Sequence, residues 1–177
     1  MKKFLLTALA VAFCAFNAQA QLRPYVGFDY VNMTPNLRDN LPDNYDIGSI
    51  NAGFAYADAG ALEIFAERSM REKRNIGGMV TRGRLFGWGG DLLISGFSFN
   101  GQGSLLGSIG YGRFTTKTRA EHGTEEEKGN ALRLGLGGEL NPTYNWGFRA
   151  MFRYSLADSD AFKNAKEFSI GARYYFD

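Results

Sequence analysis

Few residues in this chain have the chemistry of a catalytic or metal site. Its only histidine is His122, in a charged stretch, and its only cysteine is Cys14. Enzymes of the nucleophilic type need a nucleophile with a base in reach, and metal sites need clustered ligands. A solvated loop is the plainer interpretation of His122 and of the run Glu125-Glu126-Glu127 beside it. We therefore expect no catalytic residue, no metal and no cofactor.

Charged side chains of both signs do recur at alternate positions within short apolar segments. Alternation of this kind places them on one face of a strand, with apolar residues on the other face. Glycines interleave with them, so that small and long residues share a narrow enclosed space. The residues expected in this network of charges are Asp29, Glu63, Glu67, Arg133, Glu139, Arg149, Arg153 and Arg173.

A second charged group is a basic cluster between two apolar segments. Cations in such a connection could bind phosphates or an acidic polymer through salt-sensitive contacts. Ordinary solvation of a surface loop explains them equally well, because single surface charges contribute little. The candidate patch consists of Arg68, Arg71, Lys73, Arg74, Arg82 and Arg84.

The elements that must position these residues are strands. In the final stretch, 165–177, Phe168, Ile170, Tyr174 and Phe176 share one face, while Glu167 and Arg173 share the other. No helix-length period separates the apolar segments, so parallel crossovers are not expected. The pattern predicts an antiparallel meander of eight strands, at 22–33, 45–56, 61–70, 85–99, 104–114, 129–140, 146–154 and 165–177.

The connections between these strands alternate between long and short. The basic cluster lies in and on both sides of the long connection 71–78, and the glutamate run lies in another connection, 115–128. The segment 85–99 has the least regular pattern: Leu93, Phe97 and Phe99 are expected to share a face, although Leu92 and Ile94 disturb the alternation.

The beginning of the chain predicts export. Lys2 and Lys3 precede an apolar run too short for a membrane helix, and Ala20 ends it as a cleavage site. We expect residues 1–20 to be a signal peptide and residues 21–177 to be one domain. With 20 basic and 18 acidic residues in the whole chain, and both lysines lost with the signal, no field that attracts nucleic acid is expected.

Alternation alone leaves open which face of the sheet is inside. A soluble sandwich or a lipocalin-like barrel would bury the apolar face, and a membrane barrel would expose it. Paired charges interleaved with glycines favour the charged face inside. Aromatic residues near strand ends also match the two interfacial girdles of a membrane barrel. These residues are Tyr30, Tyr56, Trp146, Tyr154, Tyr174 and Phe176.

The whole predicted mature chain resembles the small eight-stranded outer-membrane barrels, namely the OmpA-type transmembrane domain, the OmpX/Ail group and the opacity-like proteins. The resemblance rests on the signal peptide, the closing strand and the runs at 110–112, 134–140 and 148–154. It implies an all-β, up-and-down transmembrane barrel in the outer membrane of a Gram-negative bacterium. Short turns would face the periplasm and longer loops would face outward.

The resemblance also implies partners. These are outer-membrane lipids including lipopolysaccharide, the assembly machinery and a host or cell-surface ligand; the barrel is expected to be a monomer. The machinery would recognise the closing strand through Phe168, Ile170, Tyr174 and Phe176, although the chain ends one residue later, at Asp177.

The leading functional interpretation is a non-enzymatic structural barrel with loops for adhesion or surface shielding. A small or gated pore is the alternative, because the internal charges could line an ion path, but eight strands leave room only for side chains and favour a plug. Less favoured alternatives are an enzyme that modifies lipid A and a lipocalin-like binding protein.

Overall fold

The computed structural model describes residues 22–37, 44–56, 59–70, 72–76, 79–99, 102–120, 123–158 and 162–176. The predicted signal peptide lies outside these ranges, as does His122. No helix long and apolar enough to cross a membrane occurs in the described parts of the chain. The described strands are β1 (Leu22–Leu37), β2 (Tyr45–Tyr56), β3 (Gly60–Ser69), β4 (Glu72–Ile76), β5 (Met79–Phe99), β6 (Gly103–Ala120), β7 (Gly123–Leu140), β8 (Trp146–Asp158) and β9 (Phe162–Tyr175).

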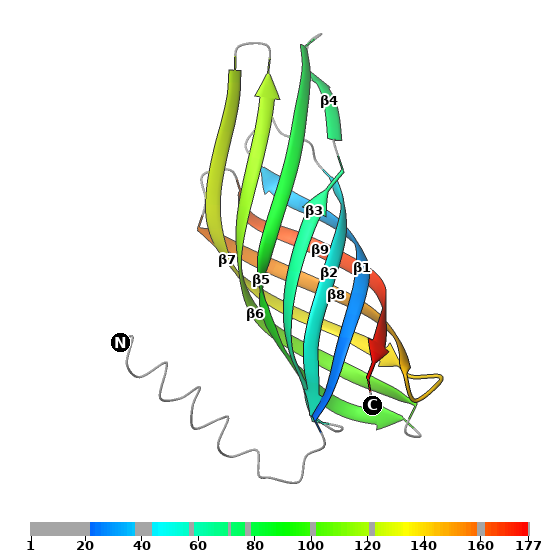
Figure 1. The fold of residues 1–177 in the computed structure, drawn as a ribbon. Coiled ribbons are helices and arrows are strands. Elements are labelled where there is room, and N and C mark those ends of the chain that lie inside the picture. The colour runs from blue at the N-terminus through cyan, green and yellow to red at the C-terminus, as the bar shows by residue number, and fades with distance from the viewer. Residues whose placement is uncertain are drawn as a thin grey trace.

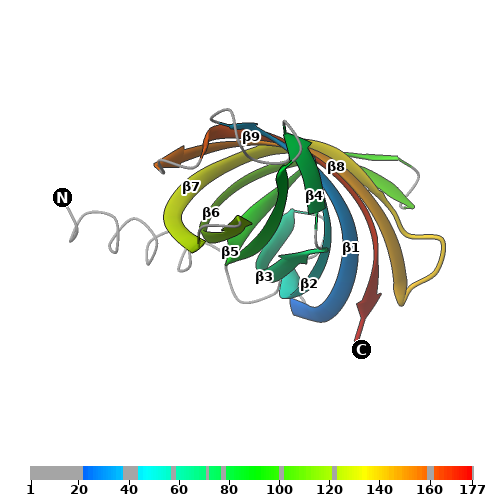
Figure 2. The same ribbon diagram turned by 90° about the horizontal axis from the view of Figure 1, so that it is seen from above.

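Eight of these strands form a closed antiparallel barrel, as predicted (Figures 1 and 2). Each strand of the barrel pairs with the next one around it, and β9 pairs back with β1. The short β4 is not part of the barrel wall, so that β3 pairs directly with β5. Residues 22 and 176 lie at the same end, where the backbone N–H of Phe176 donates to the carbonyl of Pro24 at 2.9 Å. We call this the turn end, because the β2–β3, β5–β6 and β7–β8 connections lie here, and the opposite end the hairpin end.

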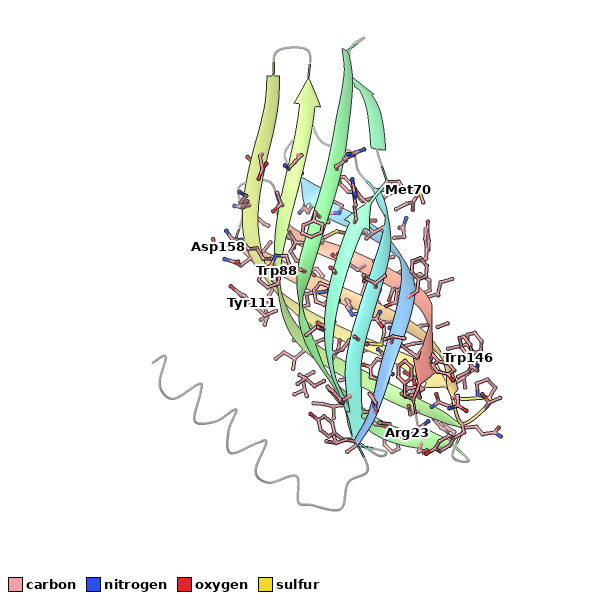
Figure 3. All side chains as sticks on the ribbon, in the orientation of Figure 1. Arg23, Met70, Trp88, Tyr111, Trp146 and Asp158 are labelled. Atoms are coloured by element: carbon pink, nitrogen blue, oxygen red, sulfur yellow. The ribbon has the colours of Figure 1, made fainter. Side chains whose placement is uncertain are left out.

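The apolar face of the sheet is on the outside. Ile50, Ile64 and Leu136 are 64%, 66% and 73% exposed, whereas the predicted network residues on β3 and β7, such as Glu63 and Arg133, are buried on the opposite face. Aromatic side chains flank this apolar band, with Trp88 and Tyr111 toward the hairpin end and Trp146 toward the turn end (Figure 3). A lipocalin-like barrel needs the reverse arrangement, so that alternative is excluded.

The strands toward the hairpin end are longer than predicted, and two expected loops are β-structure. The connection 71–78 contains β4, which pairs with the first residues of β5 in a register from Glu72–Gly83 to Ile76–Met79. The connection 115–128 continues the β6–β7 ladder to Ala120–Gly123. Polar composition suggested loops, but pairing with the neighbouring strand supplies the backbone hydrogen bonds of these extensions. Figure 1 shows β5, β6 and β7 projecting beyond the other strands.

The prediction for the segment 85–99 was wrong about its faces. Leu93 is 2% exposed and points inward, whereas Phe97 and Phe99 are 71% and 59% exposed on the outside. The β5–β6 register shifts between Ser95 and Phe97. A bulge adds one unpaired residue and reverses the alternation beyond it, which explains why this segment had no regular pattern.

The β2–β3 turn requires a glycine. Gly60 has φ +148°, and a Cβ there would lie 2.0 Å from the carbonyl oxygen of Leu93. Only a residue without a side chain fits this conformation and this close approach.

Candidate functional site

The charged side chains expected on one face meet inside the barrel in two clusters. The lower ion cluster, nearer the turn end, is built around Arg149 and Arg173. Arg149 binds Glu139 at 2.7 Å and Glu63 at 2.8 Å, and Arg173 binds Asp29 at 2.8 Å. Charge-assisted hydrogen bonds of this length are strong. Each carboxylate in this cluster is therefore satisfied.

Two tyrosines complete the lower ion cluster. The hydroxyl of Tyr25 donates to Glu63 at 2.8 Å, and the hydroxyl of Tyr175 donates to Glu139. The two rings are 5.2 Å apart between centroids. Both tyrosines come from strands whose inward positions were read as small or polar, so the network is larger than the predicted set.

The upper ion cluster, nearer the hairpin end, is built around Arg133 and Arg153. Arg133 donates to Glu167 at 2.8 Å and lies 3.9 Å from Glu67. The Nε of Arg153 lies 3.6 Å from Asp91, and its other nitrogen donates to Ser169 at 2.9 Å.

All eight residues predicted for the network lie in these two clusters, but Asp91 and Glu167 were left out. Both are 1% exposed. Glu167 stood on the polar face of the closing strand, so the alternation was sufficient to include it. Asp91 lies in the segment whose alternation the bulge obscures, and the pattern alone gave no indication of its direction.

Glycines on the inner face provide the space for these charges. A Cβ at Gly171 would lie 1.9 Å from an oxygen of Asp29, and one at Gly110 would lie 1.7 Å from an oxygen of Asp91. A real Cβ does not approach so closely. The glycines and the charged residues therefore fit together: the space beside a glycine on one strand accommodates a carboxylate from the neighbouring strand.

Apolar side chains fill the rest of the interior. At the hairpin end, Val31, Met33, Leu85 and Phe114 belong to one buried cluster beyond the upper ions. At the turn end, a second cluster with Leu93 and Met151 packs around the lower ions. A cavity at that end is lined by Arg23, Glu139 and Arg149, among others. Side chains of both kinds thus occupy the interior of the barrel.

The predicted basic patch falls on the projecting hairpins and is only partly described. Arg71 lies outside the described residues, and for Lys73, Arg74 and Arg82 the structure gives the backbone alone. Arg68 is exposed and Arg84 is half-buried.

The backbone register of the hairpins groups the basic residues differently from the sequence. Lys73 lies opposite Arg82, which lies opposite Arg119 on the next strand, and Arg84 lies opposite Lys117. We call these five positions the basic row. Arg74 lies opposite Thr81 instead, one residue out of step, and alternate residues of a strand occupy opposite faces.

In the β6–β7 hairpin, side chains of opposite charge lie next to each other instead. Glu126 binds Lys117 at 2.8 Å and Lys128 at 3.0 Å. These hydrogen bonds from the two lysines hold the pKa of the Glu126 carboxyl below its usual range. Glu126 is thus part of a ladder of paired charges. No group of three potential metal ligands occurs among the described residues.

The residues expected as an assembly signal lie on the outer face of the closing strand. Phe168, Ile170, Tyr174 and Phe176 are between 37% and 51% exposed. The Tyr174 ring meets Phe176 edge-on at 5.2 Å and Trp146 at 5.3 Å between centroids. A continuous aromatic edge therefore marks the end of the barrel where the chain finishes.

Comparison with known proteins agrees with this geometry. The family model for the outer membrane protein beta-barrel domain matches residues 4–176. Among solved structures, Neisserial surface protein A (NspA) superposes with a TM-score of 0.68 at 15% identity, covering 90% of this chain and 100% of that one. No curated protein matches the sequence.

Two further structures have the same fold. Ail, the attachment invasion locus protein of Yersinia pestis, gives a TM-score of 0.62 at 18% identity, over 90% of this chain and 100% of Ail. The N-terminal β-barrel domain of Pseudomonas aeruginosa OprF gives 0.61 at 12% identity, over 88% and 100%. At these identities the likeness concerns the fold.

Proposed function

Since the chain belongs to the outer membrane protein beta-barrel family and so resides in the outer membrane, we propose that it is a non-enzymatic, non-conducting barrel that holds a polyanion-binding sheet at the cell surface. The ligand class we infer is a sulfated or phosphorylated polymer on another cell, or the phosphates of lipopolysaccharide. Adhesion or surface shielding would follow from this binding.

The observation that carries the proposal is the basic row. Like charges directly opposite each other destabilise a sheet, yet Lys73, Arg82 and Arg119 lie in line across three strands, beside Arg84 and Lys117. Neighbouring positions on β7 show that the same sheet can place Glu126 between lysines. Because Lys117 is paired with Glu126, this cost falls on Lys73, Arg82 and Arg119, and an anionic ligand bound along them would explain it.

A structural neighbour supports the ligand class. Ail has been solved in complex with the heparin analogue sucrose octasulfate, and that structure has a TM-score of 0.60 and 17% identity to this chain. The long hairpins would present the basic row beyond the membrane surface. Exposed cations near the rim, such as Arg68 beside Phe86 and Arg113 beside Trp88, would meet lipid phosphates at the level of the aromatic girdle.

The test is binding of sucrose octasulfate to the barrel refolded in phospholipid nanodiscs. Replacing Arg82 and Arg119 with Gln removes two cations from the row. The matched control, Arg74→Gln with Arg23→Gln, removes two charges outside it. Since a cation near an anionic surface contributes about 1 kcal/mol, we expect at least about tenfold weaker binding for the first pair only. An equal loss of affinity in both double variants would indicate a non-specific charge effect and contradict the proposal.

The absence of conduction is a separate expectation. Ion pairs and two apolar clusters fill the interior, so a planar bilayer containing the folded protein should show no conductance steps. Reproducible unitary steps would instead favour the gated-pore alternative, with the ion clusters as the gate.

A further inference from the structure

The upper ion cluster contains one carboxylate that its surroundings do not satisfy. Glu167 accepts hydrogen bonds from Arg133 at 2.8 Å and from Ser155. Glu67 is 2% exposed, yet neither of its oxygens accepts a hydrogen bond from any described residue. Its nearest cationic nitrogen belongs to Arg133, 3.9 Å away, and that nitrogen already donates to Glu167.

Apolar and backbone groups surround the same carboxyl. The Arg133 guanidinium stacks 4.0 Å above the ring of Phe65, which precedes Glu67 on the inner face of β3. A Cβ at Gly87 would lie 2.9 Å from a Glu67 oxygen and 2.8 Å from the ring of Phe114. A carboxylate buried without donors costs several kcal/mol, and such a group becomes neutral instead.

The charge balance inside the barrel also favours a neutral carboxyl. The buried charged residues described are six carboxylates and four guanidiniums, which leaves an excess of negative charge. In the lower ion cluster, the carboxylates of Asp29, Glu63 and Glu139 all accept hydrogen bonds. The unsatisfied carboxylate oxygens are therefore located in the upper ion cluster, where an oxygen of Asp91 also has no hydrogen-bond partner, and nitrogens of Arg133 and Arg153 there are unpaired as well.

We propose that Glu67 is a proton-binding site of the barrel interior and carries a proton in the folded protein at neutral pH. The proton comes from solvent during folding, removes one excess charge and converts an acceptor-only group into one with a donor. The charged groups that face it are Asp91 from β5, Arg133 from β7, Arg153 from β8 and Glu167 from β9.

A pH dependence follows. The unfolded chain releases a glutamate proton near pH 4.3, whereas the folded barrel keeps this one. The native state then binds more protons than the unfolded state, so stability falls as pH rises. Binding of one extra proton corresponds to a tenfold change in the unfolding equilibrium constant for each pH unit.

The experiment uses the full chain refolded in lipid vesicles, with urea unfolding followed by tryptophan fluorescence between pH 5 and pH 8. Glu67→Gln replaces a neutral acid with a neutral amide, so its urea midpoint should equal or exceed that of the wild type and lose the pH slope. Glu167→Gln is the matched control, because it neutralises a carboxylate that is hydrogen-bonded, and its midpoint should fall.

Infrared spectroscopy provides a second readout. The wild-type barrel should show the carbonyl band of a protonated carboxylic acid at neutral pH, and Glu67→Gln should remove it. If the variant does not fold, a wild-type spectrum without this band still overturns the proposal. No such band, with a lower midpoint for Glu67→Gln, would mean a hydrated or cation-bound carboxylate and overturn the proposal. A band that persists in the folded variant would place the proton on another carboxyl and overturn it equally.

Discussion

Arg173 on β9 binds Asp29 on β1 through both terminal nitrogens of its guanidinium. NH1 and NH2 donate to the two carboxylate oxygens, each at 2.8 Å, across 144 positions of sequence. Arg173 is fully buried, and its pairing with Asp29 spans the seam at which β9 meets β1. The pair therefore joins the two ends of the sheet from the inside.

Breaking this pair should destabilise the barrel. Asp29→Asn leaves a buried guanidinium without its bidentate partner, and removal of one member of a buried pair costs about 3–5 kcal/mol. Urea unfolding in vesicles measures the loss. Asp46→Asn is the control, since Asp46 also accepts side-chain hydrogen bonds but lies at the rim, and a surface change is expected to stay within about 0.5 kcal/mol. Equal effects of the two variants would contradict the role assigned to the seam.

A methyl group on the inner face should be more harmful than one on the outer face. Gly110→Ala would bring a Cβ to 1.7 Å from an Asp91 oxygen, whereas at Gly107 the nearest atom is 4.0 Å away. We expect Gly110→Ala to reduce the folded fraction, seen as the band that migrates faster before boiling on a detergent gel, and Gly107→Ala to leave it unchanged. Normal folding of Gly110→Ala would mean that Asp91 can move aside.

Loss of the last aromatic ring should impair assembly. Phe176 is 42% exposed and packs edge-on against Tyr174, so Phe176→Ala removes part of the outward aromatic edge but no interior contact. We expect less folded protein in the outer membrane and unchanged refolding of the purified chain in detergent. Unchanged assembly in cells would show that Phe176 is not part of the recognised signal.

The hairpin ladder should be visible in the titration of Glu126. Hydrogen bonds from Lys117 and Lys128 lower the pKa of this carboxyl. Its contribution to the hairpin is therefore present above the ordinary glutamate pKa and is lost as pH falls through the lowered value. Carbon NMR of the side chain measures the shift, and replacing both lysines with Gln should return the pKa toward its ordinary value. A normal pKa in the unaltered protein would mean that these ion pairs do not persist in solution.

The faces of most strands could be predicted because alternation is a local property. Each residue of a strand points opposite to its neighbours, so the interleaving of Arg133 with Leu132 and Leu134 indicated one face without knowledge of the partners. The same reasoning failed for Leu93, because a bulge depends on how β6 pairs with β5. It also missed β4, whose polar residues become a strand only because β5 lies beside them.

The sequence by itself determined the eight strands of the barrel, the charged face of most of them, and a closed barrel with its apolar face outward. The tertiary structure alone decided which carboxylate meets which arginine. That pairing depends on the register of strands far apart in the chain, and one step of register exchanges the faces of a strand. Glu67 and Glu167 look alike in the sequence; only the arrangement of β3, β7 and β9 around Arg133 gives hydrogen-bond donors to one and none to the other.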